Sequence, residues 1–182
     1  MKVKGTWLVD YIKMIRANPD KNWDKYLTDE DREIVDSKVL ASGWYPYESF
    51  NRLGKAVFQE LAGGDLKIVK SFGRLFADNI LQVYKNLCVE GDPAATISKV
   101  FALQRTFFKD IPALIEPAEK EENRFVVRIN VSDMEREMGA VDAFAYQYAG
   151  MIERLVELCG NTNKKIEVRE IDSGYEIEST WS

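Results

Sequence analysis

The sequence predicts an α+β fold, with an N-terminal helical layer packed on a C-terminal βαββ unit. Near residue 110 the spacing of apolar residues changes from a helical period to a strand-like alternation. The charge changes at the same place, because residues 1–110 carry 17 Lys and Arg against 15 Asp and Glu, whereas residues 111–182 carry 8 against 15. The 182 residues suit one ordinary domain. We therefore expect a single domain over 1–182, with a helical subregion, 1–110, and a βαββ subregion, 111–182.

The first two predicted helices have recognisable ends. Apolar residues recur at helical spacing over Trp7–Ile15, and Asn18-Pro19-Asp20 ends this helix. Thr28 is suited to be the N-cap of a short second helix whose first turn is acidic. We expect the second helix to include Val39.

Three further helices are expected before residue 110. An apolar stripe over Phe50–Leu61 ends at Gly63-Gly64, and Asp65 can cap a long helix after it. Gly91-Asp92-Pro93 supplies a stop, a cap and a proline at the first position of the next helix, which we expect to run through Phe108. The inner face of the long helix is expected to contain Ile68, Phe72, Leu75, Phe76, Asn79, Ile80, Val83 and Leu87.

The second subregion begins with strand patterns. Ile111–Ile115 is expected as an edge or irregular strand, because Pro112 and Pro117 cannot donate ladder hydrogen bonds. Phe125–Val131 is rich in β-branched residues and predicts a regular strand. We expect a solvated turn over Glu119–Asn123 between the two strands.

A helix and a hairpin complete the chain. The apolar spacing over Phe144–Leu158 predicts an amphipathic helix, which Gly160 closes. Ile166–Arg169 and Tyr175–Trp181 alternate, and Asp172-Ser173-Gly174 between them is typical of a hairpin turn.

The composition excludes several classes of function. The chain has no histidine, which removes Ser-His-Asp and Cys-His catalysis, zinc hydrolysis and His-ligated haem. The net charge of −5 argues against nucleic acid as a partner. No apolar run approaches the roughly 20 residues of a membrane span. We see no signal peptide, and with two cysteines the sequence predicts a cytoplasmic protein without a structural disulfide.

No motif predicts catalysis, a metal site or a cofactor. Gly63-Gly64 lacks the Lys and Ser or Thr of a phosphate loop, and neither GxGxxG nor CxxC occurs. The acidic clusters at Asp29-Glu30-Asp31 and Glu119–Glu122 lie where helix starts and turns collect solvated carboxylates. We therefore expect no catalytic residues, no metal ligands and no cofactor.

Seven residues are candidates for an apolar ligand site. Four of them share one face of the long helix, and Asn79 is the only polar one, so it could orient a ligand or bond internally in a core stripe. Two aromatic residues would lie near the pocket mouth or pack a helix corner. One cysteine would end the helix, either as a thiol that is acylated or ligates a metal or as a small buried apolar residue. These residues are Phe72, Phe76, Asn79, Val83, Trp44, Tyr45 and Cys88.

Three segments carry a resemblance to a known family: Leu27-Thr28-Asp29-Glu30-Asp31, Ser42-Gly43-Trp44-Tyr45-Pro46 and Glu90-Gly91-Asp92-Pro93. The chain resembles a bacterial family with a Trp-Tyr-Pro corner. Its last helix, Gly150–Gly160, and the hairpin that ends at Trp181 are also similar to 4-vinyl-reductase-type domains, haem nitric-oxide-binding (H-NOX) domains and small subunits of the TRAPP tethering complex. The resemblance implies a helical layer on a βαββ unit, with a ligand cavity between them in several relatives.

This chain departs from these relatives at functional positions. The haem-binding relatives use a proximal histidine, which is absent here. The 4-vinyl-reductase-type domains often place cysteines at the start of the last long helix and in the final hairpin. The corresponding segments here, Ala143–Gln147 and Ile171–Glu178, contain no cysteine. The TRAPP-like relatives can carry a fatty acyl group on a helix cysteine, for which Cys88 is a loose positional match.

The sequence as a whole predicts a non-catalytic cytoplasmic module in signalling, which senses an apolar small molecule or binds either a protein partner or a second copy of the chain. A structural or tethering subunit without a ligand is the alternative. An enzyme and a haem-based gas sensor are both disfavoured, because the residues that those functions use are missing.

Overall fold

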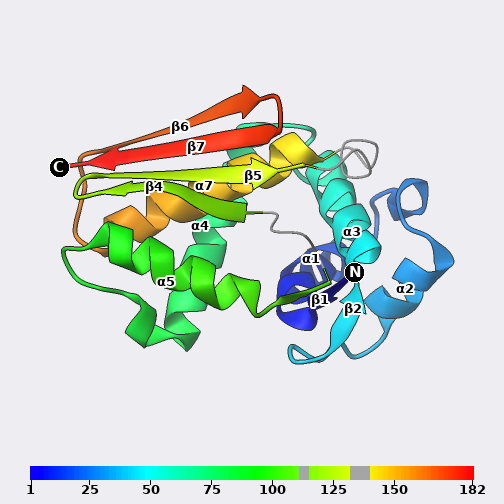
Figure 1. Cartoon of the computed structure of the whole chain (residues 1–182). Helices are drawn as coiled ribbons and strands as arrows, with labels where there is room; N and C mark the ends of the chain where they lie inside the picture. The colour runs from blue at the N-terminus through cyan, green and yellow to red at the C-terminus, as the bar shows by residue number, and fades with distance from the viewer. Residues whose placement is uncertain (111–114, 132–139) are drawn as a thin grey trace. The chain divides into compact units, whose positions relative to one another are not determined.

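The computed structural model describes residues 1–110, 115–131 and 140–182 (Figure 1). It contains helices together with two antiparallel sheets, which confirms the α+β class. The described chain divides into two compact units, one formed by 1–65 with 104–110 and the other by 66–103, 115–131 and 141–182. The helices between residues 66 and 103 therefore group with the larger sheet. The single domain stays a prediction.

The first unit combines helices with a small sheet. In chain order it contains β1 (Lys2–Lys4), α1 (Gly5–Ala17), a 3-10 turn (Trp23–Lys25), α2 (Asp29–Asp36), β2 (Trp44–Pro46), α3 (Tyr47–Glu60) and β3 (Phe108–Lys109). The strands pair in the order β2-β1-β3. The sheet was not predicted: Trp44–Pro46, expected as a corner between helices, is a strand, and the helix expected to run through Phe108 ends at Arg105. Strands of two or three residues are too short to show a period, so only their pairing reveals them.

Helix α2 is fixed at both ends by side chains. The Thr28 hydroxyl accepts from the backbone N–H of Asp31, and the Asp31 carboxylate accepts from the backbone N–H of Thr28, which forms the expected N-terminal cap. At the other end the Arg16 guanidinium donates to the carbonyl of Val35, over 2.7 Å from Nε, and to that of Ser37. The helix ends at Asp36, so Val39 lies outside it.

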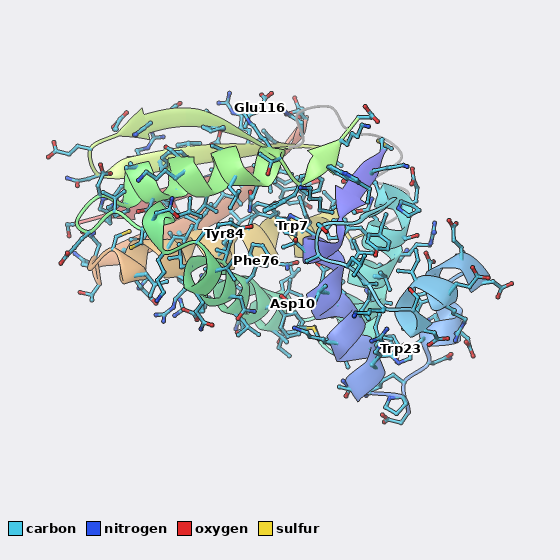
Figure 2. The ribbon with its side chains drawn as sticks, turned by 90° about the horizontal axis from the view of Figure 1, so that it is seen from below. Trp7, Asp10, Trp23, Phe76, Tyr84 and Glu116 are labelled. Carbon is cyan, nitrogen blue, oxygen red and sulfur yellow. The ribbon has the colours of Figure 1, made fainter. Side chains whose placement is uncertain are left out.

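Aromatic rings form much of the core of the first unit. Trp7 lies on α1 (Figure 2). Its ring packs against Phe50 of α3 with ring centroids 6.1 Å apart, and against Phe108 of β3 at 5.6 Å. Tyr11 and Tyr47 contact the same Phe50 ring at 5.7 and 5.9 Å. Because these rings come from α1, α3 and β3, the return of the chain at residue 108 is part of this core.

The second unit is a four-stranded antiparallel sheet with helices. It contains α4 (Leu66–Val83), a 3-10 turn (Lys85–Leu87), α5 (Pro93–Arg105), β4 (Ile115–Glu121), β5 (Arg124–Asn130), α7 (Val141–Leu158), β6 (Lys164–Ile171) and β7 (Gly174–Trp181). The strand order is β4-β5-β7-β6, and α7 packs along the sheet (Figure 1). The expected hairpin, the cap of α5 by Asp92 and the end of α7 at Gly160 are confirmed.

Strand β4 differs from the prediction. It begins at Ile115 and runs to Glu121, so most of the turn expected over Glu119–Asn123 belongs to the strand. The rest of the strand expected at Ile111–Ile115 lies outside the described residues. Pro117 lies in an edge strand next to a shift in register, a position where a residue without a backbone N–H is tolerated.

Helix α4 packs against α7 through small residues. A Cβ on Gly73 would lie 1.8 Å from the carbonyl oxygen of Gln147, and one on Gly150 would lie 1.9 Å from that of Lys70. The buried residues of α4 are Val69, Gly73, Ala77 and Ile80. The inner face expected from hydrophobicity is therefore wrong on α4 except at Ile80, because glycine and alanine make the closest contact here. Leu87, beyond the end of α4, is buried as expected. The helix also ends at Val83, so Leu87 belongs to the following 3-10 turn.

Within the described ranges, no helix has the length and hydropathy needed to cross a bilayer.

Candidate functional site

Helix α4 has three distinct faces. At 3.6 residues per turn, Val69, Gly73, Ala77 and Ile80 share the face that meets α7. A second face carries the charged residues Lys70, Arg74 and Asp78 at intervals of four. The third face, which we call the α4 apolar face, consists of Ile68, Phe72, Leu75, Phe76, Asn79 and Val83.

The α4 apolar face is only partly covered. Val83 is 71% exposed, Leu75 51% and Ile68 41%, whereas Phe72, Phe76 and Asn79 are half-buried. Phe76 is labelled in Figure 2 on this helix. Exposed apolar residues that are grouped on one face are typical of a surface that contacts a ligand or a partner. The four helix positions predicted as ligand contacts all lie on this face.

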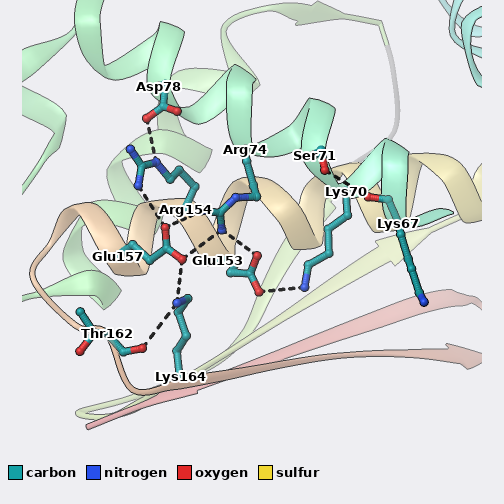
Figure 3. Close-up of polar contacts among 10 residues, drawn as sticks. All are labelled: Lys67, Lys70, Ser71, Arg74, Asp78, Glu153, Arg154, Glu157, Thr162 and Lys164. Carbon is teal, nitrogen blue, oxygen red and sulfur yellow. Dashed lines mark hydrogen bonds and ion pairs between the residues drawn. The ribbon is translucent and has the colours of Figure 1, made fainter. Parts of the chain in front are cut away.

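A network of ion pairs joins the charged face of α4 to α7 (Figure 3). The Lys70 ammonium contacts Glu153 at 2.8 Å, and Arg74 contacts both Glu153 at 2.8 Å and Glu157 at 2.7 Å. Two further cations extend the network, because Arg154 contacts Asp78 at 2.8 Å and Lys164 of β6 contacts Glu157 at 2.7 Å. The ion-pair network and the glycine contacts hold α4 on α7. The α4 apolar face lies outside this contact between the two helices.

The network shifts the acidity of its carboxylates. Hydrogen bonds from Arg74 lower the pKa of Glu157 to about 2. Burial acts in the opposite direction, and hydrogen bonds from Lys164 and Arg154 lower the pKa further. At Glu153, burial raises the pKa, and the bonds from Lys70 and Arg74 outweigh it and lower the pKa below its ordinary value. Both groups are therefore ion-pair acceptors and not proton donors near neutral pH, so the network predicts no acid–base catalysis.

We predict that Glu157→Gln reduces the loss of stability in acid. The folded pKa of Glu157 is about 2 against an ordinary 4.5, so its contribution is present above about pH 4.5 and is lost as the pH falls toward 2. Urea unfolding at several pH values should show a lower free energy of unfolding for the variant at pH 7 and a shallower fall below pH 4.5. Glu121→Gln, at an exposed carboxylate, is the matched control and should leave the slope unchanged. Equal slopes for wild type and Glu157→Gln would contradict the role of the network.

Trp44 and Tyr45 belong to the first unit, whereas the other five predicted site residues belong to the second. Trp44 is 40% exposed, and the Lys4 ammonium lies 5.4 Å from its ring. The Tyr45 hydroxyl accepts from the backbone N–H of Leu40, and its ring lies against Gly5 and Gly43. Tyr45 therefore packs the loop that precedes β2. A place for these two residues at a pocket mouth stays a prediction.

Cys88 follows the 3-10 turn after α4 and does not end the helix, because α4 stops at Val83. Its thiol contacts the carbonyl oxygen of Leu158 at 3.8 Å, at the end of α7. The neighbouring Cys159 is 2% exposed, and its Sγ lies 3.1 Å from the Thr96 hydroxyl. The sequence did not indicate that the two cysteines lie close together. One follows the 3-10 turn after α4 and the other follows the end of α7, and these segments are far apart in the chain.

The side chains that ligate haem iron in proteins are histidine, cysteine, methionine and tyrosine. Histidine is absent from the whole sequence. Burial raises the pKa of the Cys159 thiol to about 11, which opposes the thiolate that a metal needs. The donor set of this chain therefore does not fit a histidine-ligated haem. Among the described residues, no three His, Cys, Asp or Glu side chains gather into a metal site either.

The ion-pair network was missed by the sequence analysis, although a signal for it exists. Lys70, Arg74 and Asp78 recur every four residues on one helix, and Glu153 and Glu157 do so on another. Two such charged stripes beside glycines at Gly73 and Gly150 indicate a close helix pair.

Comparison with known proteins places this architecture among solved structures. No family model matches the sequence, and no curated protein does. A Shewanella oneidensis H-NOX domain, a histidine-to-glycine mutant in the Fe(II)CO ligation state, covers 98% of each chain with a TM-score of 0.62 and 13% identity. An Fe(II) unliganded H-NOX protein from K. algicida gives 0.60 at 14% identity over 98% of this chain and 96% of its own. An oxygen-binding H-NOX domain related to soluble guanylate cyclases gives 0.57 at 14% identity over 98% and 95%.

These structures share a fold with this chain, whereas the identity of the sequences is low. A likeness at this identity shows the fold alone. The resemblance to 4-vinyl-reductase-type domains and TRAPP small subunits stays a prediction. The chain has the α+β fold of H-NOX domains.

Proposed function

We propose that this chain is a non-catalytic ligand-sensing module, which binds an apolar small molecule against the α4 apolar face and does not use a histidine-ligated haem. The proposal rests on one observation. Helix α4 packs on α7 through a strip of small residues, so Leu75 and Val83 stay outside that contact and are more than half exposed. Large apolar side chains in such a position gain free energy when a ligand covers them.

Two features of α4 support a binding role. The helix is held in place by ion pairs and by glycine contacts, so its apolar face is a preorganised surface. Asn79 supplies one amide among apolar neighbours, which is the pattern of a site where a few polar groups orient an apolar ligand. The likeness to H-NOX domains supports a sensing module as the class of function.

Native mass spectrometry of the freshly purified full chain tests this function. We expect a retained small molecule, with occupancy that falls in Leu75→Ser and Val83→Ser. Leu40→Ser is the matched control, because Leu40 is 55% exposed but lies in the first unit, and it should keep full occupancy. Asn79→Leu should lose the ligand while the fold stays intact. A wild-type spectrum without any ligand, or equal occupancy in all variants, would overturn the proposal.

The exposure of Ile68, Leu75 and Val83 also favours a second function, in which the α4 apolar face binds a protein partner or a second copy of the chain. The same native spectra separate the two. A dimer whose population falls in Leu75→Ser, with no small molecule retained, would support the interaction module instead.

A further inference from the structure

The segment after α4 is bound to the end of α7 by several contacts. The backbone N–H of Gly91 donates to the carbonyl of Cys159 over 2.9 Å. The Cys88 thiol donates to the carbonyl of Leu158 over 3.8 Å. These contacts place two cysteines that are far apart in the sequence on facing backbones.

The hydroxyl of Thr96 connects the same two segments. It accepts from the backbone N–H of Val89 over 2.8 Å, and it lies 3.1 Å from the Sγ atom of Cys159. Besides burial, the Cys88 thiol also contributes to raising the pKa of Cys159, so the two thiols are neighbours. Both cysteines are free, Cys159 is buried and Cys88 is partly accessible to solvent.

We propose that Cys88 and Cys159 are a redox-modification site, at which a disulfide-containing oxidant converts the two thiols into one intramolecular disulfide that thiol reductants reverse. This proposal is independent of the ligand on the α4 apolar face. It assigns separate roles to the two cysteines from their burial, because the partly accessible Cys88 thiol meets an oxidant before the buried Cys159 thiol.

The reaction proceeds by two thiol–disulfide exchanges. The Cys88 thiolate attacks one sulfur of glutathione disulfide, which forms a mixed disulfide and releases one glutathione thiolate. Cys159 then loses its proton to solvent, and its thiolate attacks Cys88 Sγ, which releases the second glutathione. Two protein thiols are oxidised by two electrons, and one glutathione disulfide is reduced to two thiols.

The environment of Cys159 sets the rate of the second step. Burial, together with the nearby Cys88, raises the pKa of Cys159 to about 11 against the opposing bond from Thr96. Little thiolate is then present at neutral pH, and its fraction grows about tenfold per pH unit below the pKa. We therefore expect closure of the disulfide to accelerate by about tenfold per pH unit, which is about 100-fold between pH 7 and pH 9.

Peptide mapping of the full chain after treatment with glutathione disulfide tests the proposal. We expect wild type to lose two hydrogen atoms, to carry no glutathione and to yield one linked peptide that contains both cysteines. Because the link closes a long loop of the unfolded chain, the oxidised protein should melt on the order of 10 °C higher.

Two variants separate the roles of the cysteines. Cys159→Ser should stop at a stable glutathione adduct on Cys88, whereas Cys88→Ser should remain unmodified in the folded state. Thermal unfolding checks that each variant is folded. If a variant is not folded, the peptide map of the wild type alone decides the test. A wild type that keeps glutathione on Cys88, keeps two free thiols or forms disulfide-linked dimers would overturn the proposal.

Discussion

Replacement of Gly150 by alanine should lower the free energy of unfolding by about 3 kcal/mol or more. Alanine in the interior of a helix normally stabilises it by about 1 kcal/mol relative to glycine, so the expected sign is the opposite of the helix propensity. The added Cβ would lie 1.9 Å from the carbonyl oxygen of Lys70 and 2.8 Å from its carbonyl carbon. Both atoms are backbone, so α4 and α7 must separate, and the packing between them is lost.

Gly54→Ala in α3 is the matched control for this prediction. The atoms nearest to a Cβ at Gly54 would belong to the Tyr11 side chain, at 3.4 Å, which is ordinary van der Waals contact. Urea denaturation should show Gly54→Ala at wild-type stability or slightly above it, and Gly150→Ala far below. If both variants gained stability, the close contact of α4 with α7 would be wrong.

Replacement of Asp31 by alanine should destabilise the first unit by about 3 kcal/mol. Asp31 is fully buried, and its carboxylate accepts from Arg52 at 2.5 Å (Nε) and 2.8 Å (Nη2) and from the backbone N–H of Thr28. Burial raises the pKa of this carboxyl, but the bonds from Arg52, Thr28 and Ser49 outweigh it and lower the pKa. The variant leaves the guanidinium without its partner carboxylate and removes half of the capping box of α2.

Lys13→Ala is the control, because it removes an ion pair that is exposed to solvent. Lys13 is 73% exposed and lies 3.7 Å from Asp10, so its loss should change the free energy of unfolding by less than about 0.5 kcal/mol. Both variants can be compared by thermal and urea unfolding, monitored through tryptophan fluorescence. An Asp31→Ala protein as stable as Lys13→Ala would show that the bond to Arg52 contributes nothing net.

The ends of the helices and the hairpin were predictable because their chemistry is local. Thr28, Pro93 and Gly160 each fix a helix end through one side chain or one backbone angle, and the positive φ of 93° at Gly160 needs no distant partner. The hairpin follows in the same way from alternation around a turn at Asp172 and Ser173.

The small sheet and the packing of α4 were not predictable in this way. Strand β2 exists because Trp44 pairs with Lys4, a contact between distant residues that leaves no period in the sequence. On α4, the hydrophobic stripe pointed to Phe72 and Phe76, whereas the contact with α7 uses Gly73 and Ala77. A hydropathy scale ranks each residue by its free energy of transfer to an apolar phase. It therefore gives no sign that a residue without a side chain lets two helices approach closely.

The candidate site also combines features that local sequence predicts with features that depend on the tertiary fold. Its four helix residues share a face, as the spacing predicts, but their partial exposure follows from the glycine contact on the neighbouring face. The meeting of Cys88 with the end of α7 depends on the tertiary fold and has no counterpart in local sequence.

Titration of the purified full chain with haem, followed by absorption spectroscopy, tests most directly whether this H-NOX-like fold works without haem. The sequence offers no histidine, and the buried Cys159 thiol holds its proton at neutral pH. We predict a colourless protein as purified, and additions of haem that give only the broad spectrum of unbound haem. A sharp Soret band that saturates at one equivalent would contradict this account, because it would show that another side chain ligates the iron.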